Sequence, residues 1–286
     1  EDEQARRVVK LLRKACDGNA AGSCHQLGLM YAQGRGVVAD ASRAVELFRR
    51  ACEQGHPPSC TQLASMYERG RGIVQDGARA VHLYERGCQD GDPDGCAKLA
   101  SLYVRGFHVR RNLRKAFELR QRACRDKVAQ ACRDLAMMYK LGLGVDRDET
   151  VALQLLAKTC DEGDAEACYQ LGDWRELAKN VDADWTMAAG FFNKACNRNH
   201  LKSCVRLAIM LERGRGVGHN LSRAVELQKR ACEGGEAAGC GRFGWMLARG
   251  VGVRRNARRG MRLMRSACRD GDKFGCAKLH YLGGRL

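Results

Sequence analysis

Proline, membrane-length apolar segments and linker-like stretches are scarce or missing in this sequence. Only 3 of the 286 residues are proline, and no run of serine and glycine interrupts the chain. No apolar run approaches the roughly 20 residues that a membrane-spanning helix needs, so we predict no membrane span. No signal peptide is visible, and the chain begins at Glu1 rather than at methionine, so we expect a mature or trimmed form.

Signatures of catalysis are missing as well. No serine is followed by lysine in the Ser-x-x-Lys spacing that places an amine beside the nucleophile of a serine β-lactamase. The Gly-x-Gly sequences follow no strand, so they are helix-end glycines and not a phosphate loop. We therefore predict no catalytic residue, no metal site and no cofactor. The histidines form no close group of the kind that a zinc enzyme uses, since they stand singly at His25, His56, His82, His108, His200, His219 and His280.

Cysteine, by contrast, is abundant and regularly spaced. The 16 cysteines form pairs whose members are eight residues apart, and each pair follows the last after 36 residues. A fixed period of this length indicates a solenoid, in which one structural unit recurs along the chain.

The frame from Cys60 to Cys96 predicts two helices. An apolar stripe from Leu63 to Tyr67 indicates a first helix, which ends at Gly70 because glycine enters the left-handed conformation without strain. Asp76 then stands where an N-cap accepts hydrogen bonds from the free amides of a second helix, which ends at Cys88. We call these helices A and B. The N-cap position holds Asp or Asn in every complete frame, at Asp40, Asp76, Asn112, Asp148, Asp184, Asn220 and Asn256.

The pattern resembles Sel1-like repeats of the cysteine-rich kind found in secreted bacterial proteins, the Hcp type. It reads Leu-Gly/Ala-x-Met-Tyr-x-x-Gly-x-Gly-Val, then Asp, Ala-Val-x-Leu and Ala-Cys-x-x-Gly, and it covers essentially the whole chain. The resemblance implies an all-α fold, an α/α solenoid of about 16 helices related to tetratricopeptide arrays and wound as a right-handed superhelix.

We expect a single repeat domain over residues 1–286. Residues 1–23 would form an N-terminal capping helix, 24–275 seven repeats, and 276–286 a C-terminal capping helix. The position four after the second cysteine is Gly or Ala in seven frames, which lets the next helix approach closely, but it is His280 in the last. We therefore expect the array to end near Leu286, with its last helix as the cap.

The cysteine pairs leave three interpretations open. A tight turn and a small residue before each first cysteine permit local disulfides, one per repeat, whereas reduced buried thiols and a metal site are alternatives. Disulfides imply an oxidising compartment, the periplasm or the cell exterior, with the mitochondrial intermembrane space or the secretory lumen as alternatives. The predicted bridges are Cys16–Cys24, Cys52–Cys60, Cys88–Cys96, Cys124–Cys132, Cys160–Cys168, Cys196–Cys204, Cys232–Cys240 and Cys268–Cys276.

The net charge of +17 is unevenly spread along the chain. Residues 96–140 hold 12 Lys and Arg against 3 Asp and Glu, and residues 240–286 hold 12 against 2, whereas residues 141–196 hold 5 against 11. The two basic segments each carry a cluster in the same loop of the repeat, which we interpret either as a patch for an anionic partner or as a solvated edge. The clusters are Arg110, Arg111 and Arg114, and Arg254, Arg255 and Arg258.

We predict a non-catalytic scaffold that binds a protein or peptide, with acidic partners preferring the basic repeats. Tetratricopeptide-like arrays bind on the concave face lined by helix A. If this carries over, the exposed positions are one, five, eight and nine after the second cysteine. The predicted binding residues at positions five, eight and nine are Ser65, Arg69, Ser101, Arg105, Met137, Lys140, Asp173, Glu176, Ile209 and Arg213, and position one adds residues such as Thr61 and Val205.

Two other functions are weighed against the scaffold. Some proteins of the cysteine-rich Sel1 type carry a β-lactamase or penicillin-binding label, so weak β-lactam binding or hydrolysis is the alternative. Nucleic-acid binding is disfavoured, because no aromatic stacking platform accompanies the arginines. We expect a monomer. The frame from Cys168 departs most, with Trp174, Arg175, Trp185 and the loop 178–181, and is either a neutral variant or a specialised site.

Overall fold

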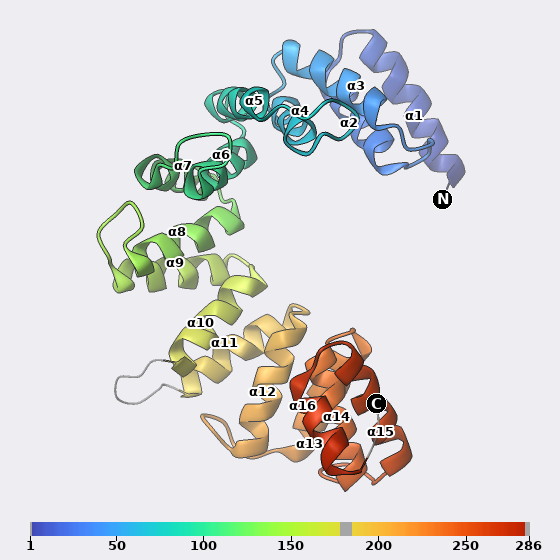
Figure 1. Cartoon of the computed structure of the whole chain (residues 1–286), viewed down its shortest axis with the longest axis vertical. Coiled ribbons are helices and arrows are strands. Elements are labelled where there is room, and N and C mark those ends of the chain that lie inside the picture. The colour runs from blue at the N-terminus through green and yellow to red at the C-terminus, as the bar shows by residue number, and fades with distance from the viewer. Residues whose placement is uncertain (1, 178–184, 284–286) are drawn as a thin grey trace. The chain divides into compact units, whose positions relative to one another are not determined.

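The computed structural model describes residues 2–177 and 185–283, and within these ranges it contains α-helices and loops but no strand (Figure 1). The predicted all-α repeat fold is confirmed, and the described residues hold 16 helices. The A helices are α2 (Ala21–Gln33), α4 (Pro57–Arg69), α6 (Pro93–Arg105), α8 (Ala129–Leu141), α10 (Ala165–Leu177), α12 (Leu201–Arg213), α14 (Ala237–Arg249) and α16 (Lys273–Tyr281). The B helices are α1 (Asp2–Asp17), α3 (Ala41–Glu53), α5 (Gly77–Gln89), α7 (Leu113–Arg125), α9 (Glu149–Asp161), α11 (Trp185–Asn197), α13 (Leu221–Glu233) and α15 (Ala257–Arg269).

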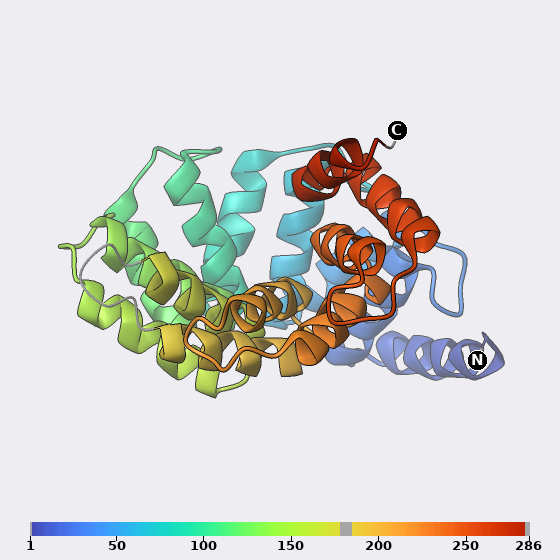
Figure 2. The ribbon, with the colours of Figure 1, turned by 90° about the horizontal axis from the view of Figure 1, so that it is seen from below.

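The helices group into two compact units, residues 1–152 and 153–286. Within each unit, every helix packs chiefly on its neighbours in the sequence, as a solenoid requires (Figures 1 and 2). Successive A helices also touch one another directly, α4 with α6 in the first unit and α12 with α14 and α14 with α16 in the second. That the whole chain forms one domain stays a prediction.

Asp and Asn side chains start the B helices, as the sequence predicts. The carboxylate of Asp76 accepts a hydrogen bond of 2.9 Å from the backbone N–H of Arg79, and Asp40, Asn112, Asp148, Asn220 and Asn256 cap their helices in the same way. Such a cap satisfies an amide that the helix leaves without a partner. The seventh predicted cap, Asp184, lies outside the described residues, as does the divergent loop 178–181.

The small residues four after the second cysteine make room for a helix B side chain. A Cβ on Gly28 would lie 2.8 Å from the ring of Phe48, and one on Gly172 would lie 2.7 Å from the ring of Phe192. Both rings are fully buried. The residue at the Phe48 position therefore fills the space between helices A and B. At this position two other repeats have the polar residues Tyr84 and Gln228.

The loop that follows an A helix rests on the start of the preceding helix B, at its first residue in four repeats and at Ala5 of α1 in the first. Each contact is so close that a Cβ on the second loop glycine would come within 3.0 Å of that residue. The pairs are Gly36 on Ala5, Gly72 on Ala41, Gly144 on Leu113, Gly216 on Trp185 and Gly252 on Leu221. An aliphatic side chain of the same loop, such as Val37, Leu143 or Val253, packs against the core beside it. These loops are therefore part of the joint between repeats.

Each turn from helix B to the next helix A carries a disulfide. The bonds join the eight predicted pairs, with Cα atoms 4.3–4.8 Å apart. The turns also contain a residue in the left-handed region, which is Gly or Asn at most positions but Lys127 in one, with φ of 63°. Among the described residues, every helix is too short or too polar to cross a lipid bilayer.

Candidate protein-binding surfaces

The predicted binding residues of the first unit lie on α4, α6 and α8. Arg69, Arg105 and Met137 are exposed, whereas Ser65, Ser101 and Lys140 are half-buried. Arg105 is not a free cation, because its Nη2 lies 3.6 Å from Oε1 of Glu68 on the preceding A helix. Ser101 donates a hydrogen bond of 3.1 Å to the carbonyl of Ala97 in its own helix. The three arginine and methionine side chains are thus the most accessible of this set.

A buried tyrosine is hydrogen-bonded to Glu68, the residue that contacts Arg105. The hydroxyl of Tyr84, which belongs to α5, donates a hydrogen bond of 2.8 Å to Oε2 of Glu68. Burial of the phenol, followed by its hydrogen bond to this carboxylate, raises the pKa of Tyr84 above its usual range. Glu68 therefore links a side chain of helix B to Arg105 on the next helix A. This link holds a charged group in place at the surface.

In the second unit, Asp173 and Glu176 of α10 bind an arginine of the next A helix. Nη2 of Arg206 in α12 lies 3.2 Å from Oδ1 of Asp173 and also contacts Oε2 of Glu176. The Arg206 guanidinium also lies over the ring of Phe192, at 5.6 Å. Arg206 therefore compensates one of the two negative charges of these predicted binding residues.

The neighbouring joint between α12 and α14 uses the same positions. Glu212 faces Arg242, and Gln228 of α13 donates a weak hydrogen bond of 3.5 Å to Glu212. Burial raises the pKa of Glu212, and burial lowers the pKa of Arg242 although Glu212 opposes that change. Of the predicted residues here, Ile209 is half-buried and Arg213 is exposed. Arg206 and Arg242 are not among the predicted binding residues, although a basic residue recurs two positions after the second cysteine at 206, 242 and 278.

The prediction that the residue directly after the second cysteine is exposed is wrong for two of the central repeats. Thr61 and Val205 are 5% and 6% exposed, whereas Ala97, Arg133 and Tyr169 at the same position are half-buried. The hydroxyl of Thr61 donates to Oδ2 of Asp92, which also caps α6. The equivalent pair one repeat earlier is His25 and His56, whose Nδ1 atoms each lie 2.9 Å from the hydroxyl of Ser59. Thr61 and His25 therefore belong to the contact between repeats.

One side-chain arrangement has the composition of a hydrolase triad. Nδ1 of His200 lies 2.8 Å from the hydroxyl of Ser203, and its Nε2 lies 3.1 Å from Oε2 of Glu166. However, Ser203 is completely buried, and its own N–H donates to the same Nδ1. His200 is the N-cap of α12, so these contacts stabilise a helix start and offer no accessible nucleophile. The arrangement gives the β-lactamase alternative no support.

The two predicted basic patches lie at equivalent places in the two units. Arg110, Arg111 and Arg114 are exposed in the loop and first turn of α7, and Arg254, Arg255 and Arg258 are exposed in the loop and first turn of α15. Cations at a helix N-terminus oppose the helix dipole, so these arginines are not placed there to stabilise the helices. Arg114 is partly compensated, since its Nε lies 3.4 Å from Oε1 of Glu118.

A cluster of cations and aromatic rings on α14 and α16 was not predicted. Nζ of Lys278 lies 4.8 Å from the ring centre of Trp245, and the Arg249 guanidinium lies 5.5 Å from the same centre. Tyr281, which is 70% exposed, packs edge-on against Trp245 at 5.9 Å. Basic residues two and nine after the second cysteine are visible in the sequence, but the contact between two A helices that brings Lys278 and Trp245 together is not.

A comparison with protein-family models places these surfaces in context. The model described as Sel1 repeat matches residues 21–56, 57–92, 93–127, 129–164, 165–200, 201–236 and 237–272. The chain belongs to the Sel1 repeat family. Each matched Sel1 repeat runs from the start of a helix A through helix B to the disulfide-bearing turn.

Solved structures share the fold of these Sel1 repeats. A protective antigen of uropathogenic Escherichia coli with an SLR fold matches with a TM-score of 0.80 and 25% identity, over 96% of this chain and 59% of its own length. A Sel1 repeat protein of Oxalobacter formigenes matches with a TM-score of 0.79 and 24% identity, over 99% of this chain and 82% of its own. Helicobacter pylori cysteine-rich protein B matches over 46% of this chain and 93% of its own, with 25% identity and a TM-score of 0.38. No curated protein sequence matches the chain.

Proposed function

We propose that this Sel1 repeat protein is a non-catalytic scaffold that binds acidic protein or peptide segments on the faces of its A helices. The observation that carries this proposal is a cation that recurs at the same place on successive A helices. Arg69 and Arg105 hold it in the first unit, and Arg213 and Arg249 hold it in the second, all of them exposed. Like charges repeated along a surface favour a partner of opposite charge.

Apolar groups on A helices of each unit favour a polypeptide partner over a small anion. Met137 and Leu141 of α8 are 37% and 57% exposed, and Ile209 of α12 is half-buried beside Arg213. A-helix surfaces that offer both charged and apolar groups suit a polypeptide segment, which carries both kinds of side chain.

The compartment we propose is the periplasm or the cell exterior. Eight disulfides, one in each turn, are typical of proteins that fold under oxidising conditions. The similar Escherichia coli protein is a protective antigen present in uropathogenic strains.

Charge reversal on the two kinds of helix tests the proposal. We expect R105E/R213E to weaken the binding of a fluorescein-labelled glutamate-rich peptide at least about tenfold and to reduce the salt dependence of its affinity. The matched control, R49E/K229E, makes the same change in charge at exposed positions of the B helices α3 and α13, where Lys229 lies 3.8 Å from Glu233 much as Arg105 lies near Glu68. Equal losses in the two variants would show that net charge alone attracts the peptide and would remove the A-helix assignment.

A further inference from the structure

In the first unit, the last residues of three successive A helices form a row that changes from cationic to apolar. Helix α4 ends at Arg69, α6 ends at Arg105 and α8 ends at Leu141, and each of these is the ninth residue after the second cysteine of its repeat. All three are exposed. A ligand that covers this row must therefore offer negative charge to α4 and α6 and an apolar group to α8.

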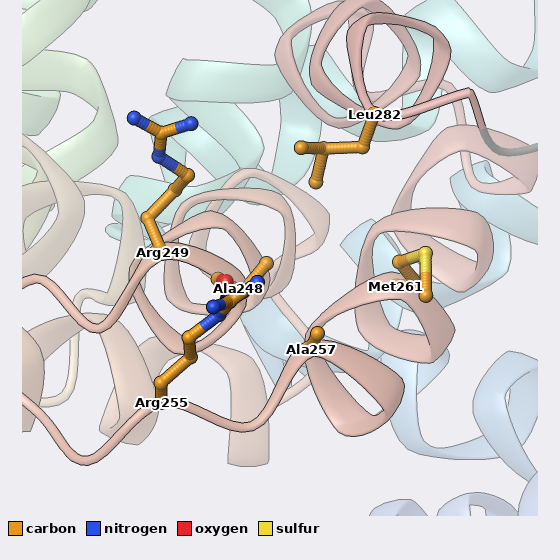
Figure 3. A pocket seen from close by; sticks show the side chains of 6 residues that line it. All are labelled: Ala248, Arg249, Arg255, Ala257, Met261 and Leu282. Atoms are coloured by element: carbon orange, nitrogen blue, oxygen red, sulfur yellow. Dashed lines mark hydrogen bonds between the residues drawn. The ribbon is translucent and has the colours of Figure 1, made fainter.

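The cations at this position face outward and are accessible. Figure 3 shows the equivalent residue of α14 in the second unit, Arg249, extending away from Ala257 and Met261 of the following helix B. In the first unit, the Arg105 side chain is 60% exposed although its Nη2 lies 3.6 Å from Oε1 of Glu68. Arg105 therefore keeps guanidinium surface that a partner carboxylate can reach.

The apolar end of the row is wider than one side chain. Met137 is exposed and lies one helical turn before Leu141 in α8, so both side chains are on the same face of that helix. Phe107, in the loop after α6, is also exposed, and the Arg105 guanidinium lies 5.7 Å from its ring centre. Apolar groups thus accompany the cation at α6 and replace it at α8, where an aliphatic partner side chain fits best.

The spacing of the A helices selects the conformation of the partner. Helices α4 and α6 are in direct contact, and α6 and α8 share one hydrophobic core. The axes of packed helices are about 8–10 Å apart. A polyproline II segment advances about 9 Å in each turn of three residues, so every third side chain lies on the same side and meets the next A helix. In a β-strand, residues three apart lie on opposite faces, and seven residues of an α-helix advance about 10.5 Å, which exceeds this spacing.

We infer that the row of Arg69, Arg105 and Leu141, which we call the α4–α8 row, binds a polyproline II segment with two acidic residues three apart and an aliphatic residue three positions further on. The two carboxylates accept hydrogen bonds from the arginines of α4 and α6, and the aliphatic side chain covers Leu141 and Met137. A segment that already has this conformation loses little freedom on binding. The inference rests on the proposed function and adds the sequence pattern of the partner.

Two fluorescein-labelled peptides of the same composition test the spacing with the full chain. Leu-Pro-Pro-Glu-Pro-Pro-Glu-Pro-Pro-Leu contains the required pattern in both chain directions, whereas Leu-Pro-Pro-Pro-Glu-Glu-Pro-Pro-Pro-Leu has adjacent glutamates. We expect the wild type to bind the first peptide about fivefold more tightly at low salt, because only its glutamates reach both arginines and one exposed ion pair contributes about this much. Equal affinities for the two peptides would overturn the inference.

A single substitution should change the preference at α8. L141R extends the cations of the row by one helix, and Arg69 and Arg105 show that arginine is compatible with this helix end. The second probe is Glu-Pro-Pro-Glu-Pro-Pro-Glu-Pro-Pro-Glu, in which glutamate replaces both leucines. We expect L141R to shift the ratio of the two affinities about tenfold toward the glutamate-ended peptide, since it exchanges an apolar contact for an ion pair.

The matched control for L141R is V74R. Val74 is an exposed aliphatic residue in the loop after α4, so V74R adds the same charge to the first unit outside the row. We expect V74R to change the ratio of affinities less than about twofold, the effect of a screened surface charge. An equal shift in L141R and V74R would show that added charge alone sets the preference, and it would exclude Leu141 from the contact.

The outcomes separate this inference from the proposed function. If the glutamate-rich peptide binds and R105E/R213E weakens it, but the two peptides of equal composition bind equally or not at all, the α4–α8 row is wrong and the scaffold stands. If no acidic peptide binds at low salt, both fall. If a helical peptide with glutamates seven residues apart binds more tightly than the proline-rich peptides, the partner is an α-helix and the polyproline II inference is overturned.

Discussion

At the scale of single residues, the contact between successive repeats, here called the joint, is made by the same two positions each time. The residue types at these two positions differ from one joint to the next. The pair is His25 and His56 in the first joint, Thr61 and Asp92 in the second, and Tyr169 and His200 in another, where the two rings lie 4.9 Å apart. The geometry of the joint is thus conserved within the chain while its polarity varies. Each joint can therefore respond differently to pH.

The first joint should be sensitive to acid. Burial, and secondly the charge of His56, lowers the pKa of His25 from 6.5 to about 4, so the folded protein favours the neutral imidazole. Protonation then favours the unfolded chain, and the contribution of His25 is intact above its unfolded pKa near 6.5 and is lost as pH falls toward 4. The loss amounts to at most about 3 kcal/mol.

Urea unfolding between pH 7 and pH 4 measures this effect. We expect H25T/H56D, which copies the pair Thr61 and Asp92, to lose less stability over this range than the wild type does. The exposed His82 supplies the control, because H82T should follow the wild-type curve. Parallel curves for the wild type and the double variant would contradict the assignment of acid sensitivity to this joint.

At the scale of elements, the loop after α6 contacts helix B with the two residue types interchanged. Here the loop supplies a side chain and helix B supplies the glycine. His108 replaces the second loop glycine and still adopts the left-handed conformation, with φ of 61°. The residue on which this loop rests is Gly77, where a Cβ would lie 2.0 Å from Nδ1 of His108. Elsewhere the loop contributes the glycine and helix B contributes the side chain, so the two residues have exchanged roles here.

This exchange predicts strong coupling between the two positions. We expect G77A to destabilise the protein by about 1–3 kcal/mol, because the new methyl group meets the imidazole. The double variant G77A/H108G restores the Ala–Gly pair found at Ala41 and Gly72, and it should recover most of that loss. A double-mutant cycle in urea gives the coupling energy, and additive effects of the two changes would show that the contact is unimportant.

The helices and their ends could be predicted from the sequence, whereas the contacts between repeats could not. Asp76 and Gly70 act on amides and carbonyls a few residues away, so a local pattern is enough to assign them. Arg206 instead acts on Asp173 and Glu176 one repeat earlier. The 36-residue period predicts that charged residues recur at equivalent positions, but it does not predict which face of one repeat contacts the next. Thr61 was therefore assigned to a binding face although it is buried in a joint.

At the scale of the whole molecule, the disulfides stabilise the chain repeat by repeat. The bridges lie within each turn and link residues only eight apart, so they stabilise each repeat without tying distant repeats together. A short local loop of this kind contributes roughly 2–3 kcal/mol in the chain-entropy model. In a solenoid each repeat is stabilised only by its own contacts and by those with its neighbours. Reduction of all the disulfides should therefore lower the stability of every repeat.

The redox state of the native protein is therefore the measurement that decides the compartment. We expect the intact mass of natively expressed protein, alkylated without reduction, to show no alkylated thiol and the mass of eight bridges. Reduction before alkylation should add 16 alkyl groups and lower the urea midpoint. If most thiols of the native protein react without reduction, the cysteines are packed thiols, the oxidising compartment is excluded, and partners for Arg69 and Arg105 should be sought inside the cell.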